Sequence, residues 1–174
     1  MVSDPTPKKP YVSDYSDNRK IDPKKQLHWK EVSKKIQHSK NYWISTTYKS
    51  RPHLVPIWGI WYDNKFCFST SQISKKARNL YKNAYCAIST ENANHPVIVE
   101  GIANQEHNIT TLKAIVELYN EKYHWKFSVS SQGIFDDVGN GGPIFIVKPL
   151  KVLAWESFPK SFTVWSFSKK PDSA

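Results

Sequence analysis

Residues 53–80 read HLVPIWGIWYDNKFCFSTSQISKKARNL, and the rest of the chain is organised around this stretch. It contains two apolar, aromatic-rich runs, and Asp63-Asn64 between them has the chemistry of a tight hairpin turn. A polar stretch then leads to Ser74, which stands where the N-cap of a helix would stand. The segment therefore predicts a strand, a turn, a second strand from 65 to 70, and a helix from about Ser74 to Lys82.

The start of this predicted helix is cationic. Lys75 and Lys76 directly follow the N-cap, although positive charges in a first turn oppose the helix dipole. Free backbone N–H groups, hydroxyls and ammonium groups together suit a phosphate. Ser69 and Thr70, at the end of the second strand, could contribute to such a site or simply be strand-end hydroxyls. The segment predicts an anion site, and the alternative is a capped helix start with solvated lysines.

Composition limits the possible classes of protein. The 174 residues, 39% of them hydrophobic and 14% aromatic, are enough for one domain with a real core. The net charge of +10 fits a solvated basic tail, an anionic ligand or nucleic acid. No apolar run approaches the roughly 20 residues of a membrane span, and no apolar core follows the N-terminal charges. We therefore expect a cytoplasmic protein without a membrane partner.

Two cysteines, Cys67 and Cys86, lie inside apolar runs. Because the chain has no CxxC motif and no Cys/His spacing, we expect buried thiols and no metal site. Residues 1–23 are rich in Pro, Asp, Ser and Lys, which predicts a disordered or loosely docked basic tail. The domain would then span residues 24–174 and begin with a short amphipathic helix over 24–39.

The remaining pattern is mostly that of short strands. Pro56 predicts an edge or a bulge, and Gly101 predicts a bulge or a close backbone approach. Residues 109–123 have helical apolar spacing, with Thr110 or Thr111 as the expected cap. Residues 126–142 are polar and glycine-rich, which predicts a mobile loop. The further predicted strands are 41–48, 54–62, 84–90, 96–106, 143–147, 152–155 and 162–167. This is a mainly β, α+β class: an antiparallel barrel of six to seven strands with two or three helices.

Several segments in this order resemble the pyridoxamine 5′-phosphate oxidase-like family of FMN-binding split barrels, which includes members that use the deazaflavin F420. The resemblance covers about residues 26–168, and its most specific piece is Ser74-Lys75-Lys76-Ala77-Arg78-Asn79-Leu80. The other matching pieces are RPHLVPIW (51–58), FCFST (66–70), VEGIA (99–103) and TVWSF (163–167).

The resemblance implies a homodimer that binds two flavins at the subunit interface. It implies that the strand segment Val55, Pro56, Ile57 and Trp58 runs beside the flavin ring. It also implies that Ser69, Thr70, Ser74, Lys75 and Lys76 hold the phosphate. Trp165, on the last strand, would approach the ring or pack in the interface.

Two departures from the family pattern concern the substrate and the phosphate. Trp165 is flanked by Val164 and Ser166 where the family commonly has an Arg, which disfavours pyridoxamine phosphate as the substrate. Lys75 stands where Arg is frequent, and Lys supplies charge without the bidentate fork.

The sequence therefore predicts an FMN-dependent oxidoreductase with a small organic substrate, in which the cofactor carries the redox chemistry. The alternatives are an F420-dependent reductase and a flavin carrier or sensor without efficient turnover. Nucleic-acid binding through lysines and aromatics is the less favoured reading.

Overall fold

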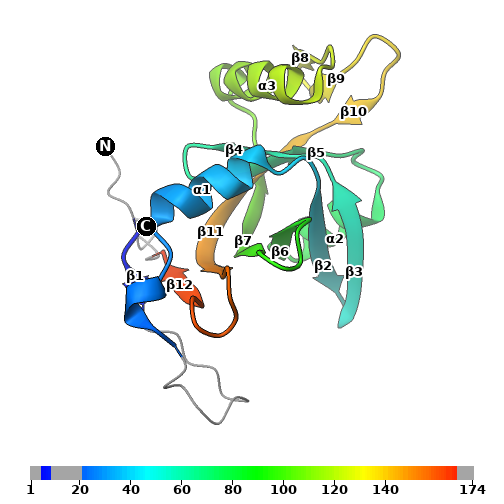
Figure 1. Cartoon of the computed structure of the whole chain (residues 1–174). Coiled ribbons are helices and arrows are strands. Elements are labelled where there is room, and N and C mark those ends of the chain that lie inside the picture. Colours follow the sequence, from blue (N-terminus) through cyan, green and yellow to red (C-terminus); the bar gives the residue numbers. More distant parts are fainter. Residues whose placement is uncertain (1–4, 9–20, 168–174) are drawn as a thin grey trace, which may run out of the picture.

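The computed structural model describes residues 5–8 and 21–167 (Figure 1). Its helices are the 3-10 helix η2 (Pro23–Lys25), α1 (Trp29–His38), α2 (Lys75–Lys82) and α3 (Ile109–Tyr123). Its longer strands are β2 (Tyr42–Tyr48), β3 (Arg51–Ile57), β5 (Lys65–Ser69), β6 (Tyr85–Thr90), β7 (Val97–Gln105) and β11 (Ile144–Ala154). Its shorter strands are β1 (Pro7–Lys8), β4 (Ile60–Tyr62), β8 (Ser128–Ser130), β9 (Gly133–Phe135), β10 (Gly141–Gly142) and β12 (Thr163–Ser166).

The main sheet has nine strands and is antiparallel throughout. Its main path runs β1-β12-β11-β7-β6-β2-β3, and β5 joins β11 to β4. The first half of β11 pairs with both β5 and β7, whereas its second half pairs with β7 and β12. The α+β class is confirmed. The strand number exceeds the prediction because β1 adds to the sheet and the predicted strand 54–62 divides into β3 and β4.

The expected hairpin and edge are present. Asp63 and Asn64 have φ values of 48° and 55°, as a tight turn between β4 and β5 requires. Within the described residues β3 pairs only with β2, so Pro56 lies on a sheet edge as predicted. Gly101 faces β11 at a register shift, and a Cβ there would meet the Lys148 carbonyl oxygen at 2.5 Å. This close approach was also predicted.

Three predictions of element bounds or caps are wrong. The predicted strands 143–147 and 152–155 form one strand, β11, because a bulge at Pro149 keeps the pairing with β7. The first α-helix begins at Trp29 and not at residue 24, since Asp22 caps the separate helix η2. The cap of α3 is Asn108, whose side chain accepts from the Thr111 N–H at 3.0 Å.

The glycine-rich segment 126–142 is not a loop. It forms the small sheet β10-β9-β8, which packs on α3 as a separate lobe beside the main sheet (Figure 1). The backbone of Gly133, Gly141 and Gly142 has φ values of 135–155°, where side chains are rarely tolerated. Ile134 is fully buried against α3, and this burial orders the segment.

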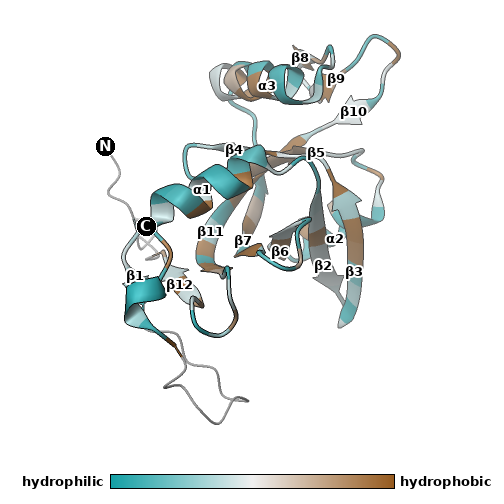
Figure 2. Ribbon diagram, in the orientation of Figure 1, coloured by the Kyte–Doolittle hydropathy of each residue, from teal (hydrophilic) through white to brown (hydrophobic). Residues whose placement is uncertain are grey.

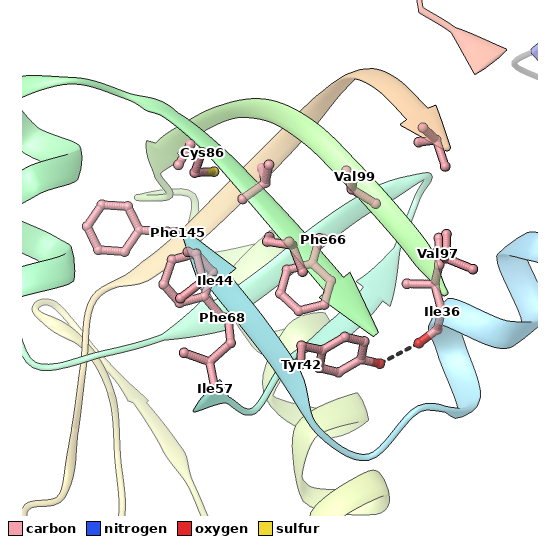
Figure 3. Packing of buried hydrophobic residues seen from close by; sticks show 14 of the residues in the cluster. Ile36, Tyr42, Ile44, Ile57, Phe66, Phe68, Cys86, Val97, Val99 and Phe145 are labelled. Carbon is pink, nitrogen blue, oxygen red and sulfur yellow. Dashed lines mark hydrogen bonds between the residues drawn. The ribbon is translucent and has the colours of Figure 1, made fainter. Parts of the chain in front are cut away.

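Two apolar cores support the two parts of the molecule. The barrel core packs α1 and α2 against the sheet, and Figure 3 shows Tyr42, Phe66, Phe68 and Phe145 among its buried side chains. Trp29, Val32 and Ile36 form the buried stripe of α1, whose other residues are largely hydrophilic in Figure 2. The second core lies under α3 and includes Cys67, which is buried and free like Cys86.

The predicted N-terminal tail, 1–23, lies partly outside the described residues, namely at 1–4 and 9–20. Pro7 and Lys8 pair with Trp165 and Val164 of β12 and extend the sheet by one short strand. None of the described helices combines the length and apolarity that a bilayer span requires.

Candidate functional site

A cleft of about 900 Å³ lies between the main sheet and the α3 lobe. One side is the end of β5, the connection to α2 and the first turn of α2, and we call residues 69–76 the cradle wall. The other side is aromatic, and we call Trp58, Tyr119, Trp125, Phe127 and Phe135 the aromatic wall. Asn140 to Pro143 close the cleft between the two walls.

Hydroxyl groups converge on the cradle wall. Thr70 Oγ1 and Ser74 Oγ lie 3.1 Å apart, and the Ala77 N–H donates to Ser74 Oγ at 3.2 Å. Because Thr70 and Ser74 share one hydrogen between them, the other hydroxyl hydrogen remains available to a ligand. Ser69 Oγ donates to the Gly142 carbonyl at 3.0 Å and can therefore still accept a hydrogen bond.

The cradle wall is electropositive. Residues 42–90 contain seven Lys or Arg (49, 51, 65, 75, 76, 78 and 82) and one acid, Asp63, which pairs with Lys65 at 2.6 Å. The first turn of α2 has no acidic residue. Within the described residues neither Lys75 nor Lys76 forms an ion pair. This end of the cleft therefore favours an anion.

Two pKa shifts follow from this environment. Partial burial lowers the pKa of Lys76. Partial burial also lowers the pKa of His53, and the charges of Lys75 and Lys76 lower it further. His53 on β3 thus faces the helix start, but its imidazole is biased towards the neutral form there.

The aromatic wall is fixed by hydrogen bonds to the main chain. The Tyr119 hydroxyl donates to the Trp58 carbonyl at 2.9 Å and accepts from the Ser69 N–H at 3.3 Å. The Trp58 ring stacks on Tyr123 at 4.6 Å, and Trp125 stands edge-on to Trp58 at 6.0 Å. Tyr119 therefore connects the aromatic wall to the cradle wall.

The carboxylate of Asp136 has a local role. It accepts from the Asn140 and Val138 main chains at 2.7 and 3.1 Å. It also accepts from the Asn140 side chain at 3.0 Å and from Trp125 Nε1 at 3.3 Å. Desolvation raises the pKa of Asp136, but these hydrogen bonds lower it more, so the net shift is downward. The carboxylate orders the β9–β10 turn and is not free to bind a ligand.

The structure brings half of the predicted site residues into the cleft. They are Trp58, Ser69, Thr70, Ser74 and Lys76. Lys75 lies beside them at the helix start but is exposed and does not line the cleft. On β3, Val55 packs partly against the barrel core, Pro56 is exposed and Ile57 is buried. None of these three residues lines the cleft of a single chain.

The position of Trp165 corrects a prediction. Its side chain is fully buried, 5.5 Å from the Trp29 ring, and it belongs to the barrel core. Trp29 on α1 covers the face of β12 that was expected to approach a flavin ring. The alternating pattern of 162–167 predicted a strand correctly but did not show which face a helix would cover.

Sequence reasoning missed most of the aromatic wall. Trp125 and Phe127 lie in a polar stretch, and Tyr119 appears only as an apolar position of a helix. A pair of aromatic residues just before a glycine-rich segment is the one signal that could have indicated them. Their grouping depends on how α3 packs on β5.

The sequence has no match among protein-family models or among curated proteins. Solved structures with a similar fold share little sequence with it. A Listeria innocua protein assigned as a pyridoxamine 5′-phosphate oxidase is 10% identical, with a TM-score of 0.59, over 74% of this chain and 98% of that one. An F420 reductase is 18% identical, with a TM-score of 0.52, over 69% of this chain and 94% of that one.

A third similar structure is a heme-binding protein from Mycobacterium smegmatis. It is 11% identical, with a TM-score of 0.60, over 78% of this chain and 57% of that one. At these identities the likeness concerns the fold, and proteins with different cofactors share it. The chain therefore has the split-barrel fold of the pyridoxamine 5′-phosphate oxidase-like proteins.

Proposed function

We propose that this protein is a flavin-dependent oxidoreductase that binds FMN, with the phosphate on the cradle wall. The observation that carries the proposal is the convergence of Thr70, Ser74 and Lys76 in one cleft without a free carboxylate. The Lys75 and Lys76 main-chain N–H groups, at the start of α2, would add two donors to the phosphate. A bound flavin would supply the electron or hydride transfer.

The rest of the cleft fits a flat ring system. The aromatic wall presents Trp58 and Trp125, which are 42% and 44% exposed, and a planar ligand can cover them by stacking. The free edge of β3 offers main-chain polar groups that could bond the polar rim of a flavin ring. In this proposal the protein's residues bind the phosphate, orient the ring and exclude water, while a small organic substrate reacts at the ring.

We further propose that two copies of the chain assemble across the outer face of the sheet. Tyr85, Leu54 and Trp43 are 54%, 60% and 44% exposed, and the strand registers place all three on this face. Several exposed apolar side chains on one sheet face favour an interface. Because Pro56 lies on the same face, a ring beside β3 would be close to both subunits, as the resemblance implies.

An F420-dependent reductase is the second candidate, since the similar structures include an F420 reductase. Both cofactors combine a ring with an anionic tail, which the cationic cradle wall accommodates. A flavin carrier or sensor is the third candidate, and it would bind the same cofactor without efficient turnover.

The absorption spectrum and the mass of the ligand released from the purified protein test the proposal. We expect a yellow protein that releases FMN, or that takes up FMN on titration. A colourless protein that binds neither FMN nor F420 would contradict both cofactor proposals. Steady-state oxidation of NAD(P)H or reduced F420 then separates an enzyme from a carrier.

A separate measurement tests the dimer. Sedimentation of the wild-type protein should give twice the chain mass, and Leu54→Glu should shift it towards the monomer. Exposed Lys113→Glu on α3 is the matched control, and it should leave the mass unchanged. A monomeric wild type would contradict the dimer proposal and leave the phosphate site to be tested by itself.

A further inference from the structure

A second hollow, of about 300 Å³, lies apart from the cleft. We call it the α1–α3 groove, because α1, β4 and α3 line it. Trp61 and Leu118 give it apolar walls, whereas His38, Glu121 and Lys122 give it polar groups. At about 30 Å³ per water molecule, the groove has room for a small organic molecule.

Lys122 is held in this groove by two neutral acceptors. Its Nζ donates to the Tyr42 hydroxyl at 2.6 Å and to the Gly59 carbonyl at 3.0 Å. It also lies over the Tyr42 and Tyr123 rings, at 4.8 and 5.5 Å from their centres. No carboxylate of the described residues lies within ion-pair distance of Nζ. Two of the three N–H groups of the Lys122 ammonium therefore have a hydrogen-bond acceptor, and the third has none among the described residues.

The partners of Tyr42 decide which proton Lys122 can lose. The Tyr42 hydroxyl is within hydrogen-bond reach of the Ile36 carbonyl, as Figure 3 shows, and of the Ser39 carbonyl at 2.8 Å. Since its hydrogen is donated there, its oxygen accepts from Lys122. The proton that Lys122 releases is then the one that forms no hydrogen bond with the protein. The lone pair of the neutral amine is consequently left at the position without a protein partner, and Lys122 is one of the residues that line the groove.

The electrostatic surroundings favour this neutral amine. Burial lowers the pKa of Lys122 to about 8, and the charge of Glu91 raises it slightly against that trend. Burial raises the pKa of both Tyr42 and Tyr123, so the two phenols beside Nζ stay uncharged. His38 and Glu121 are the other titratable groups on the groove.

We propose that Lys122 is a nucleophilic amine that forms imines with small apolar aldehydes or ketones in the α1–α3 groove. The neutral amine adds to the carbonyl carbon, a C–N bond forms, and one proton moves from nitrogen to oxygen. Loss of water from this adduct then gives the imine, so no oxidant or reductant takes part. His38 and Glu121 line the groove and can exchange the protons of the dehydration step. The site does not depend on the cofactor cleft.

Reductive labelling of the whole protein tests this proposal. Benzaldehyde and cyanoborohydride at pH 8 convert each imine into a stable benzyl amine, and peptide mapping by mass spectrometry locates the modified residues. An ordinary lysine has a pKa near 10.4, so Lys122 should react at least about 10-fold faster than exposed Lys113 on the same helix. The map also separates Lys122 from the α-amino group of Met1.

Two variants and a pH series complete the test. Lys122→Arg keeps the hydrogen-bond donors but removes the nucleophile, and it should abolish the fast labelling. Lys113→Arg should leave that labelling unchanged. In the wild type, the rate at Lys122 should rise through pH 8 and level off by about pH 9. Labelling of Lys122 no faster than that of Lys113 in the folded wild type would overturn the proposal.

Discussion

The two walls of the cleft differ in how the chain builds them. The cradle wall comes from the single continuous segment 69–76, whereas the aromatic wall collects residues from positions 58 to 135. The first wall is polar and cationic and suits an anion. The second is flat and apolar and suits a ring. A contiguous motif can be recognised in the sequence, but a wall assembled from several elements depends on their packing.

Hydrogen bonds join the cradle wall to the aromatic wall and to the segment that closes the cleft. Tyr119 bonds to both Trp58 and Ser69, and Gly142 accepts a hydrogen bond from Ser69. Trp165, by contrast, takes part in neither wall. Substitutions at these positions therefore separate what supports the fold from what forms the site.

The largest expected effect is on stability, at Trp165. Trp165→Ala empties a fully buried position and should lower the free energy of unfolding by about 3–5 kcal/mol, measured by urea denaturation. Trp58→Ala removes a ring that is 42% exposed, so it should cost less stability but weaken FMN binding. If the folded Trp165→Ala protein lost more FMN affinity than Trp58→Ala, Trp165 would belong to the site after all.

The next effect tests the contact between Gly142 and Thr70. A Cβ at Gly142 would lie 2.2 Å from the Thr70 carbonyl oxygen, at a φ of 155°. Gly142→Ala should therefore cost more than the roughly 1–3 kcal/mol of backbone strain alone. Gly139→Ala is the matched control, because its φ is 85° but no atom lies within 4 Å of the added Cβ. Equal losses of stability in thermal unfolding would show that the close approach of Gly142 to Thr70 adds nothing to the backbone strain.

A smaller effect should follow from removing one oxygen. Tyr119→Phe deletes the hydroxyl that bonds the Trp58 carbonyl and the Ser69 N–H, and it should cost about 1–3 kcal/mol of stability. It should also weaken FMN binding, because Trp58 loses a support. Tyr48→Phe, at a position 40% exposed, is the control and should change neither quantity.

The last expected effect is a pH dependence of stability. The pKa of Lys122 is lowered to about 8 in the folded protein. Between pH 8 and the pKa of lysine in the unfolded chain, about 10.4, the unfolded chain therefore binds more protons than the folded protein. Stability should therefore rise with pH in this window. Lys122→Arg cannot titrate there, so the wild type should gain stability relative to this variant between about pH 8 and 10. If the difference in urea midpoint between the wild type and Lys122→Arg stayed constant over this pH range, the lowered pKa would be contradicted.

The elements with local signals were predicted well. The apolar spacing of 109–123 gives α3 its observed bounds, and Ser74 caps α2 as expected. These features depend on neighbouring residues, so a sequence pattern is enough to find them.

Features that depend on tertiary packing were missed. Segment 126–142 is ordered because Ile134 is buried against α3, and Trp165 is buried because Trp29 covers it. Trp29 lies far from Trp165 in the sequence, and α3, although it directly precedes segment 126–142, contacts Ile134 only because the small sheet folds back on the helix. The same reason explains why the cradle wall was foreseen and most of the aromatic wall was not.

The most direct test of the account compares FMN with riboflavin, which lacks the phosphate. The wild type should bind FMN about 10- to 100-fold more tightly, which corresponds to a net gain equal to one charge-assisted hydrogen bond, roughly 1.5–3 kcal/mol. The double variant Lys75→Ala/Lys76→Ala should lose most of this difference while its riboflavin affinity stays the same. Lys24→Ala/Lys25→Ala on η2 removes equal charge elsewhere and should behave like the wild type. An unchanged preference for FMN in the Lys75/Lys76 variant would contradict the phosphate site.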